Sequence, residues 1–127
     1  MNTALWIVAG LLAAVALAGG LTKALLPKEK LGAKAGGEWL ADASAGFVRG
    51  LGVLEILAAA GLILPAVLDI APVLVPVTAV AWILLMIGAM ITHLRYPGGA
   101  KFAAVNSIYL LLAAFLAWGR FVLEPFA

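Results

Sequence analysis

Several residue types that carry chemistry are scarce or missing in this sequence of 127 residues. There is no cysteine, which excludes disulfides, thiol catalysis, iron–sulfur clusters and cysteine-based zinc sites. The single histidine, His93, rules out bis-histidine haem ligation within the chain. Charged residues make up only 11% of the sequence, with a net charge of +2 and no basic stripe with interleaved aromatics. Nucleic acid is therefore excluded as a partner.

Hydrophobic residues dominate instead, at 66% of the chain. A soluble chain of this length has too little interior to bury so much apolar surface, whereas a bilayer solvates it. A helix needs about 20 apolar residues to span the hydrocarbon core. Four stretches meet that need: about residues 3–21, 46–68, 73–94 and 102–122. They lack the alternation of barrel strands, so we predict an all-α integral membrane protein, a four-transmembrane-helix bundle in one domain over residues 1–127.

The first apolar stretch resembles a signal peptide in one respect. Residues 16–20 (ALAGG) are apolar and mostly small, as at a cleavage site. However, no Lys or Arg precedes the stretch, and a signal peptide has a basic segment there. We therefore interpret it as a retained helix.

The predicted connections differ in length. The first loop, residues 22–45, holds most of the charge, and its residues 38–42 suit a short interfacial turn anchored by Trp39. Ser44 is expected to cap the second helix, because a serine oxygen accepts from the first free backbone N–H groups. The third loop, residues 95–101, reads as a plain turn.

The basic residues indicate an orientation. The first and third loops lie on one side of the membrane, and basic residues favour the cytoplasmic side. Seven of the eight basic residues belong to that side: Lys23, Lys28, Lys30, Lys34, Arg49, Arg95 and Lys101. Only Arg120 lies opposite. Loops 22–45 and 95–101 are therefore predicted to be cytoplasmic, with both termini outside.

Glu55 is the clearest polar residue within a predicted span. It lies about nine residues into the second helix, or roughly 13 Å deep at 1.5 Å per residue. A carboxylate at that depth needs an ion-pair or hydrogen-bond partner, or it has a functional role. It could form an ion pair with Lys23 or a protonated acid bonded to Asn106, either of which would only lock the bundle. Alternatively, it could bind a ligand or transfer a proton, with Gly52 and Ala59 leaving room beside it.

All four predicted helices bring a polar group to the cytoplasmic half. The candidate site residues are Lys23, Arg49, Glu55, His93 and Asn106. Together they predict a polar pocket open toward that leaflet, with Glu55 at its floor. Each also has an ordinary explanation, such as a snorkelling lysine or arginine, an interfacial histidine or an interhelical amide. One histidine and one glutamate make too thin a set for a metal site, and no catalytic role is assigned.

The chain resembles the DoxX-like family of small four-helix membrane proteins. The resemblance covers nearly the whole chain and rests on residues 19–23 (GGLTK), 49–55 (RGLGVLE), 61–65 (GLILP), 89–93 (AMITH) and Asn106. It implies a fold more than a reaction. Some members are tied to an archaeal quinone-linked oxidase, to membrane redox complexes or to oxidative-stress defence, and a vertebrate branch resembles assembly chaperones for receptor channels.

Three functional hypotheses follow. In the first, an accessory subunit binds a quinone or another isoprenoid-like molecule in the pocket, with Glu55 and either His93 or Asn106 at its polar head. In the second, the chain is a membrane scaffold or assembly chaperone that packs against other membrane proteins or a second copy, without ligand chemistry. In the third, an enzyme or isomerase uses Glu55 and His93 as acid and base on a lipophilic substrate.

Overall fold

Four long helices account for most of the chain in the computed structural model, which describes residues 1–33 and 37–126. Their bounds are Asn2–Leu25 (α1), Ala45–Val67 (α3), Leu74–Leu94 (α4) and Ala100–Trp118 (α5). Three short elements complete the fold: Lys28–Gly32 (α2), a 3₁₀ turn at Glu38–Asp42 (η1) and a π-helical turn at Gly119–Leu123 (η2). Each long helix, with η2 continuing α5, is long and apolar enough to span a membrane. The predicted all-α class is confirmed.

The first helix is longer than predicted. It continues past residue 21 to Leu25, where Leu26 N still donates to Thr22 O at 2.9 Å. Pro27 follows, and a residue before proline is pushed out of the helical region. Leu26 accordingly has an extended backbone, with φ −84° and ψ 146°. As a result, Lys23 lies in the last turn of α1 rather than in a loop.

The segment between α1 and α3 contains the predicted turn and one helix that was not predicted. Residues 38–42 form η1, and Ser44 caps α3, because Phe47 N donates to Ser44 Oγ at 3.0 Å. The single-turn helix α2 begins directly after Pro27. A proline suits the start of a helix, since its missing N–H would have no intrahelical partner there. The predictions of the turn and of the cap are confirmed.

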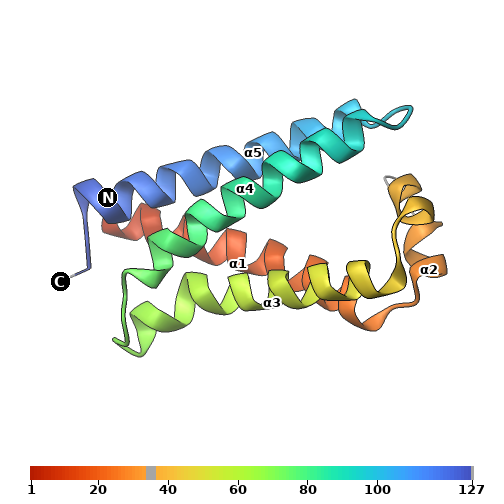
Figure 1. Cartoon of the computed structure of the whole chain (residues 1–127). Coiled ribbons are helices and arrows are strands. Elements are labelled where there is room, and N and C mark those ends of the chain that lie inside the picture. Colours follow the sequence, from red (N-terminus) through yellow and green to blue (C-terminus); the bar gives the residue numbers. More distant parts are fainter. Residues whose placement is uncertain (34–36, 127) are drawn as a thin grey trace.

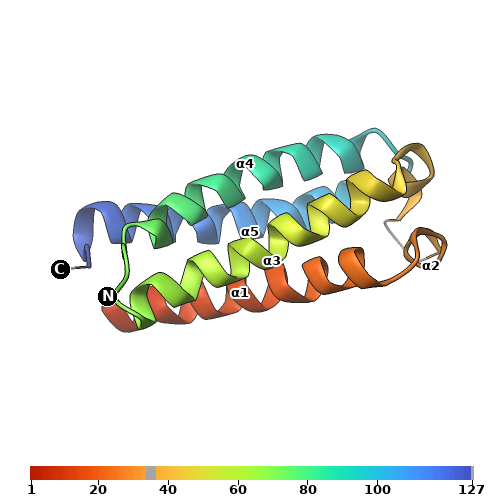
Figure 2. The ribbon, with the colours of Figure 1, turned by 60° about the horizontal axis from the view of Figure 1, so that its bottom comes forward.

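The long helices pack as two pairs. Helix α1 lies along α3, and α4 lies along α5 (Figures 1 and 2). Both termini and the α3–α4 turn are at one end of the bundle, and α2, η1 and the α4–α5 turn are at the other (Figure 1). In the view of Figure 1, the two pairs separate toward the end with α2. We call these the terminal end and the loop end.

Two glycines allow α1 and α3 to touch through their backbones. A Cβ atom on Gly20 would lie 2.7 Å from Gly52 O, and one on Gly52 would lie 2.6 Å from Ala24 N. Real Cβ atoms essentially never lie this close to other atoms, so a side chain at either position would force the two helices to shift. Close contact through small residues is a usual way in which membrane helices associate.

The hydrophobic core fills the half of the bundle nearer the terminal end. Leu5 and Leu12 of α1, Leu62 of α3 and Leu116 of α5 are completely buried in one cluster with Trp82 of α4. Large apolar side chains cover the outside, including Leu57 and Leu111, which are 61% and 65% exposed. An apolar outer surface of this kind is suited to lipid.

Candidate ligand-binding pocket

A cavity of about 690 Å³ lies at the loop end, beyond the core. All four long helices and η1 contribute to its walls, which combine apolar side chains with a smaller polar group. We call it the loop-end pocket. Its polar lining residues are Thr22, Lys23, Asp42, Glu55, Thr92, His93, Arg95, Tyr96 and Asn106. A volume of roughly 300–1,000 Å³ is typical of pockets for small molecules and cofactors.

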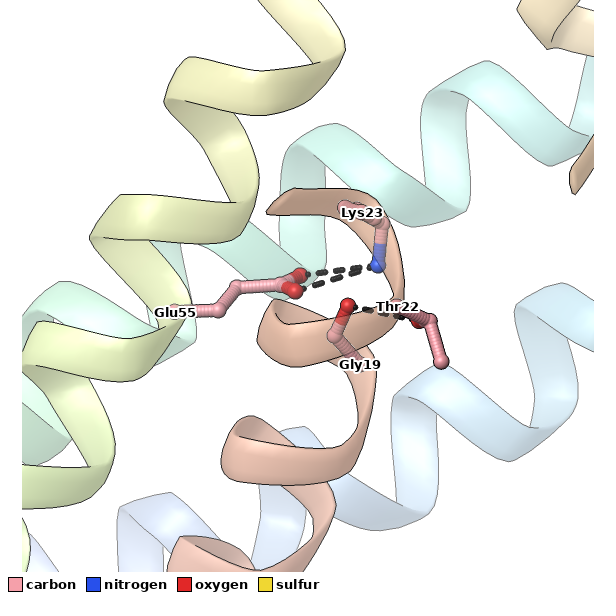
Figure 3. A network of polar contacts seen from close by, with 4 residues as sticks. All are labelled: Gly19, Thr22, Lys23 and Glu55. Carbon is pink, nitrogen blue, oxygen red and sulfur yellow. Dashed lines mark hydrogen bonds and ion pairs between the residues drawn. The ribbon is translucent and has the colours of Figure 1, made fainter. Parts of the chain in front are cut away.

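Glu55 and Lys23 form an ion pair on the wall of this pocket (Figure 3). The lysine Nζ donates to both carboxylate oxygens, at 3.2 Å to Oε1 and 3.1 Å to Oε2. Gly19, one helical turn before Lys23, leaves the space, since a Cβ there would lie 3.2 Å from Oε2. Glu55 is only 6% exposed, and a buried carboxylate requires such a partner. Of the two structural interpretations of Glu55, the contact observed is the one with Lys23.

Asn106 contributes an unpaired donor. The residue lines the loop-end pocket from α5, and its Nδ2 atom is buried without an acceptor among residues 1–33 and 37–126. Most buried polar atoms in proteins have a hydrogen-bond partner, so an exception at a pocket wall is informative. It marks the place where a ligand atom that accepts a hydrogen bond would be stabilised.

His93 and Phe102 form an aromatic part of the wall. His93 lies in the last turn of α4 and Phe102 in the first turn of α5, and their ring centroids are 5.4 Å apart with the planes tilted by 32°. Both residues line the pocket. The sharp turn between these helices brings them together, and it depends on Gly99, because a Cβ there would overlap His93 O.

The five candidate site residues are not all at the pocket. Lys23, Glu55, His93 and Asn106 line it, whereas Arg49 is exposed and does not. Arg49 immediately follows the buried Val48, so it lies beside the inward face of α3 and not on it. Its position is that of a surface charge.

Two lining residues, Asp42 and Tyr96, were not among the candidates. The Tyr96 hydroxyl donates to the Asp42 carboxylate, which joins η1 to the α4–α5 turn across the pocket. This hydrogen bond raises the pKa of the Tyr96 phenol, because ionisation would remove the donor and place two negative charges together. No sequence spacing signals a contact between loops 54 positions apart. The only available hint was that both loops were predicted on the same side.

Within residues 1–33 and 37–126, no three His, Asp or Glu side chains come together as ligands. The pocket wall combines an ammonium and an amide as hydrogen-bond donors with an aromatic part and apolar sides.

These features define a multi-pass α-helical membrane protein with a polar pocket at one end of its bundle. A sequence model of the DoxX-like family matches residues 7–116. The chain therefore belongs to the DoxX-like family. No curated protein and no solved structure matches it.

Proposed function

We propose that this protein is a redox-associated accessory subunit that binds a small hydrophobic molecule with a carbonyl-bearing head, such as a quinone, in the loop-end pocket. The observation that carries the proposal is the buried Nδ2 of Asn106, which lines the pocket without an acceptor among the described residues. Leaving a buried donor unpaired costs about 1–3 kcal/mol. A ligand carbonyl at this atom would recover that free energy. The redox association rests on the DoxX-like family, some of whose members are tied to quinone-linked oxidases.

The remaining polar groups support a head that only accepts hydrogen bonds. Lys23 directs hydrogen bonds to Glu55, but an ammonium has three donors and can also serve a ligand. Glu55 then acts as a positioning residue that holds Lys23 at the wall. A quinone has two carbonyl acceptors and no donor, and its flat ring would stack beside the rings of His93 and Phe102.

The apolar walls support a lipid-soluble tail. Phe47 of α3 and Leu84 of α4 line the pocket and are also 60% and 66% exposed. The apolar lining thus continues onto the outer surface of the bundle, between these two helices. An isoprenoid-like tail would pass there into the bilayer, because both environments are apolar.

The scaffold or chaperone hypothesis is the alternative, and the ion pair favours it. A buried Lys23–Glu55 pair also has a purely structural use, the fixing of α1 against α3. Under this alternative, removal of the pair alters stability and recovery of partner membrane proteins without changing any ligand signal.

The acid–base enzyme has less support. Both Glu55 oxygens accept from Lys23, so the carboxylate is engaged in an ion pair and is a weak base for a substrate. Glu55 and His93 do line the same pocket, which is the minimum that such an enzyme would need.

The charge distribution supports an orientation with the loop end in the cytoplasm. Lys28, Lys30, Arg95 and Lys101 belong to the loop end, whereas Arg120 is at the terminal end. Basic residues are retained on the cytoplasmic side during insertion. The loop-end pocket would then open in the cytoplasmic half of the membrane.

Titration of decylubiquinone into the full-length protein in nanodiscs tests the binding function. Trp39 lines the pocket, so quenching of its fluorescence reports occupancy. We expect saturable quenching that weakens about tenfold or more in Asn106→Leu, because one hydrogen bond from a buried donor is lost at nearly constant volume. Ser107→Ala is the matched control, since Ser107 bonds to its own helix at Ala104 O and does not line the pocket.

The result distinguishes the alternatives. Absence of saturable quenching in the wild-type protein, with naphthoquinone probes as well, would overturn ligand binding. Equal affinity in Asn106→Leu, Lys23→Met and the wild type would contradict the assigned head position. Co-purification of a stable partner whose recovery depends on Glu55, without any quinone signal, would favour the scaffold.

A further inference from the structure

The terminal end holds a second buried charge, Arg120. It belongs to the π-helical turn η2 and is only 4% exposed. π-Helical turns are rare and often occur at functional sites. The turn packs closely on α1, because a Cβ on Gly119 would overlap the Leu5 side chain. This packing fixes the backbone at Arg120. An arginine side chain that faced lipid at this position would be energetically costly.

Only some of the hydrogen-bond donors of the Arg120 guanidinium have an acceptor in the described part of the protein. Arg120 Nη1 donates to the backbone oxygen of Glu124 at 3.0 Å, whereas Nε is buried without an acceptor among residues 1–33 and 37–126. Among the same residues, no carboxylate oxygen lies within 4.0 Å of a guanidinium nitrogen, which is the limit for an ion pair. The positive charge is therefore buried without an ion-pair partner in the described chain.

Aromatic rings flank the guanidinium. Its Cζ is 4.0 Å from the Phe126 ring centroid and 5.9 Å from that of Trp6, and these two rings meet edge to face. Cation–π contacts stabilise the charge but accept no hydrogen bond from Nε. The edge of the guanidinium formed by Nε and Nη2 remains the part that can bind two oxygen atoms side by side.

A small cavity adjoins Arg120. Its volume is about 180 Å³, and its lining residues are Val73, Pro76, Arg120, Phe121, Pro125 and Phe126. Arg120 is the only charged residue among them. The cavity has room for one small group and not for a whole lipid. We call it the terminal cavity.

We propose that the terminal cavity binds a phosphate group through Arg120. A phosphate presents paired oxygens to the Nε–Nη2 edge and neutralises the buried charge, and membrane surfaces are rich in phosphate esters. The source is a lipid headgroup at the terminal face of the bundle or free phosphate. Glu124 is the nearby carboxylate, and its exposed side chain lowers the local positive potential. This site is at the opposite end from the loop-end pocket and does not depend on it.

Titrations of the full-length protein in a maltoside detergent, which contains no phosphate, test the proposal. The probes are short-chain phosphatidylglycerol, inorganic phosphate and a diacylglycerol with the same chains as the phosphate-free control. Trp6 fluorescence is the readout because its ring is near Arg120, and Trp6→Phe identifies its share of the signal. We expect saturable binding of a phosphate-bearing probe and none of diacylglycerol. Binding to the lipid alone makes a headgroup the source, and binding to inorganic phosphate alone makes it the free ion.

Variants link the signal to the arginine. Arg120→Gln should weaken binding about tenfold or more, Arg120→Lys should weaken it less, and Glu124→Gln should strengthen it by removal of the neighbouring negative charge. The exposed Arg49 at the loop end provides the control, and Arg49→Gln should leave the signal unchanged. If neither probe binds, or if binding survives in both Arg120 variants, the proposal is overturned. It is equally overturned if Glu124→Gln destabilises the folded protein as much as Arg120→Gln does, because Glu124 would then be the partner of Arg120.

Discussion

The Lys23 ammonium of α1 bonds to both carboxylate oxygens of Glu55 on α3, at 3.2 and 3.1 Å. The two side chains differ in exposure, at 23% for Lys23 and 8% for Glu55. The pair is beside the Gly20–Gly52 contact, where the two helices touch through their backbones. It therefore fixes α1 to α3 at the wall of the loop-end pocket, whichever function that pocket has.

Removal of one member of this ion pair should destabilise the protein more than removal of both members. Glu55→Gln or Lys23→Met leaves the other partner without its counter-charge, whereas Lys23→Met with Glu55→Leu leaves an apolar contact. Because Lys23 is partly exposed, each single loss should stay below the roughly 3–5 kcal/mol of a fully buried pair. Thermal unfolding in detergent measures the three variants. A double variant as unstable as the sum of the singles would show that the charges do not interact.

Substitution of Gly20 or Gly52 by alanine should separate α1 from α3. The new methyl group would be under 3 Å from backbone atoms of the other helix, and overpacking of this kind costs about 1–3 kcal/mol. Gly10→Ala and Gly50→Ala are the matched controls, since a Cβ at either position meets nothing within 4 Å. They should be neutral or stabilising by up to about 1 kcal/mol, because alanine favours helix. Equal melting temperatures in all four variants would contradict the close contact.

Much of the fold could be predicted because the bilayer imposes length and polarity on each span. The long apolar runs predicted α1, α3, α4 and α5 with ends within a few residues of those observed. The extension of α1 to Leu25 was missed because Thr22 and Lys23 look like loop residues, and only Pro27 ends the helix. The π-helical turn η2 depends on tertiary packing of Gly119 on Leu5, which no local pattern encodes.

The site could be predicted only in part. The predicted depth of each residue in the membrane put Lys23, Glu55, His93 and Asn106 in the same half of the bundle. Depth does not indicate the face of the helix on which a side chain lies. Arg49 is six positions before Glu55, and at 3.6 residues per turn these two side chains point to different faces. Helical phase would therefore have separated Arg49 from the rest. The unpaired state of Asn106 Nδ2 could not be predicted, because it depends on every neighbour at once.

A bulky residue at position 88 should obstruct the loop-end pocket. Gly88 lines the pocket, and a Cβ there meets nothing within 4 Å, so Gly88→Leu can be accommodated while its side chain occupies the space. Quinone quenching should weaken severalfold, with little change in melting temperature. Gly50→Leu is the control, because Gly50 is equally open but outside the pocket. Undiminished quenching in Gly88→Leu would place the ligand elsewhere.

The Asp42–Tyr96 hydrogen bond should be visible in a phenol titration. Because the Asp42 carboxylate accepts from the Tyr96 hydroxyl, the pKa of Tyr96 should exceed the usual value of about 10. The contribution of this bond to stability is thus present at neutral pH and is lost as pH rises through the raised pKa. Asp42→Asn should lower the pKa of Tyr96. Absorbance of phenolate in a Tyr109→Phe background isolates Tyr96, and Asp69→Asn, on the α3–α4 turn, should leave the pKa unchanged.

The orientation of the bundle can be tested with single cysteines, since the native chain has none. Ala33 is exposed at the loop end and Ile70 is exposed at the terminal end. If basic residues keep the loop end in the cytoplasm, a membrane-impermeant maleimide added to intact cells should label Ile70→Cys and not Ala33→Cys. Lysis should make Ala33→Cys reactive, which controls for access to the thiol. The reverse labelling would put the loop-end pocket in the outer leaflet, and Arg120 would then face the cytoplasm against the charge bias of the other basic residues.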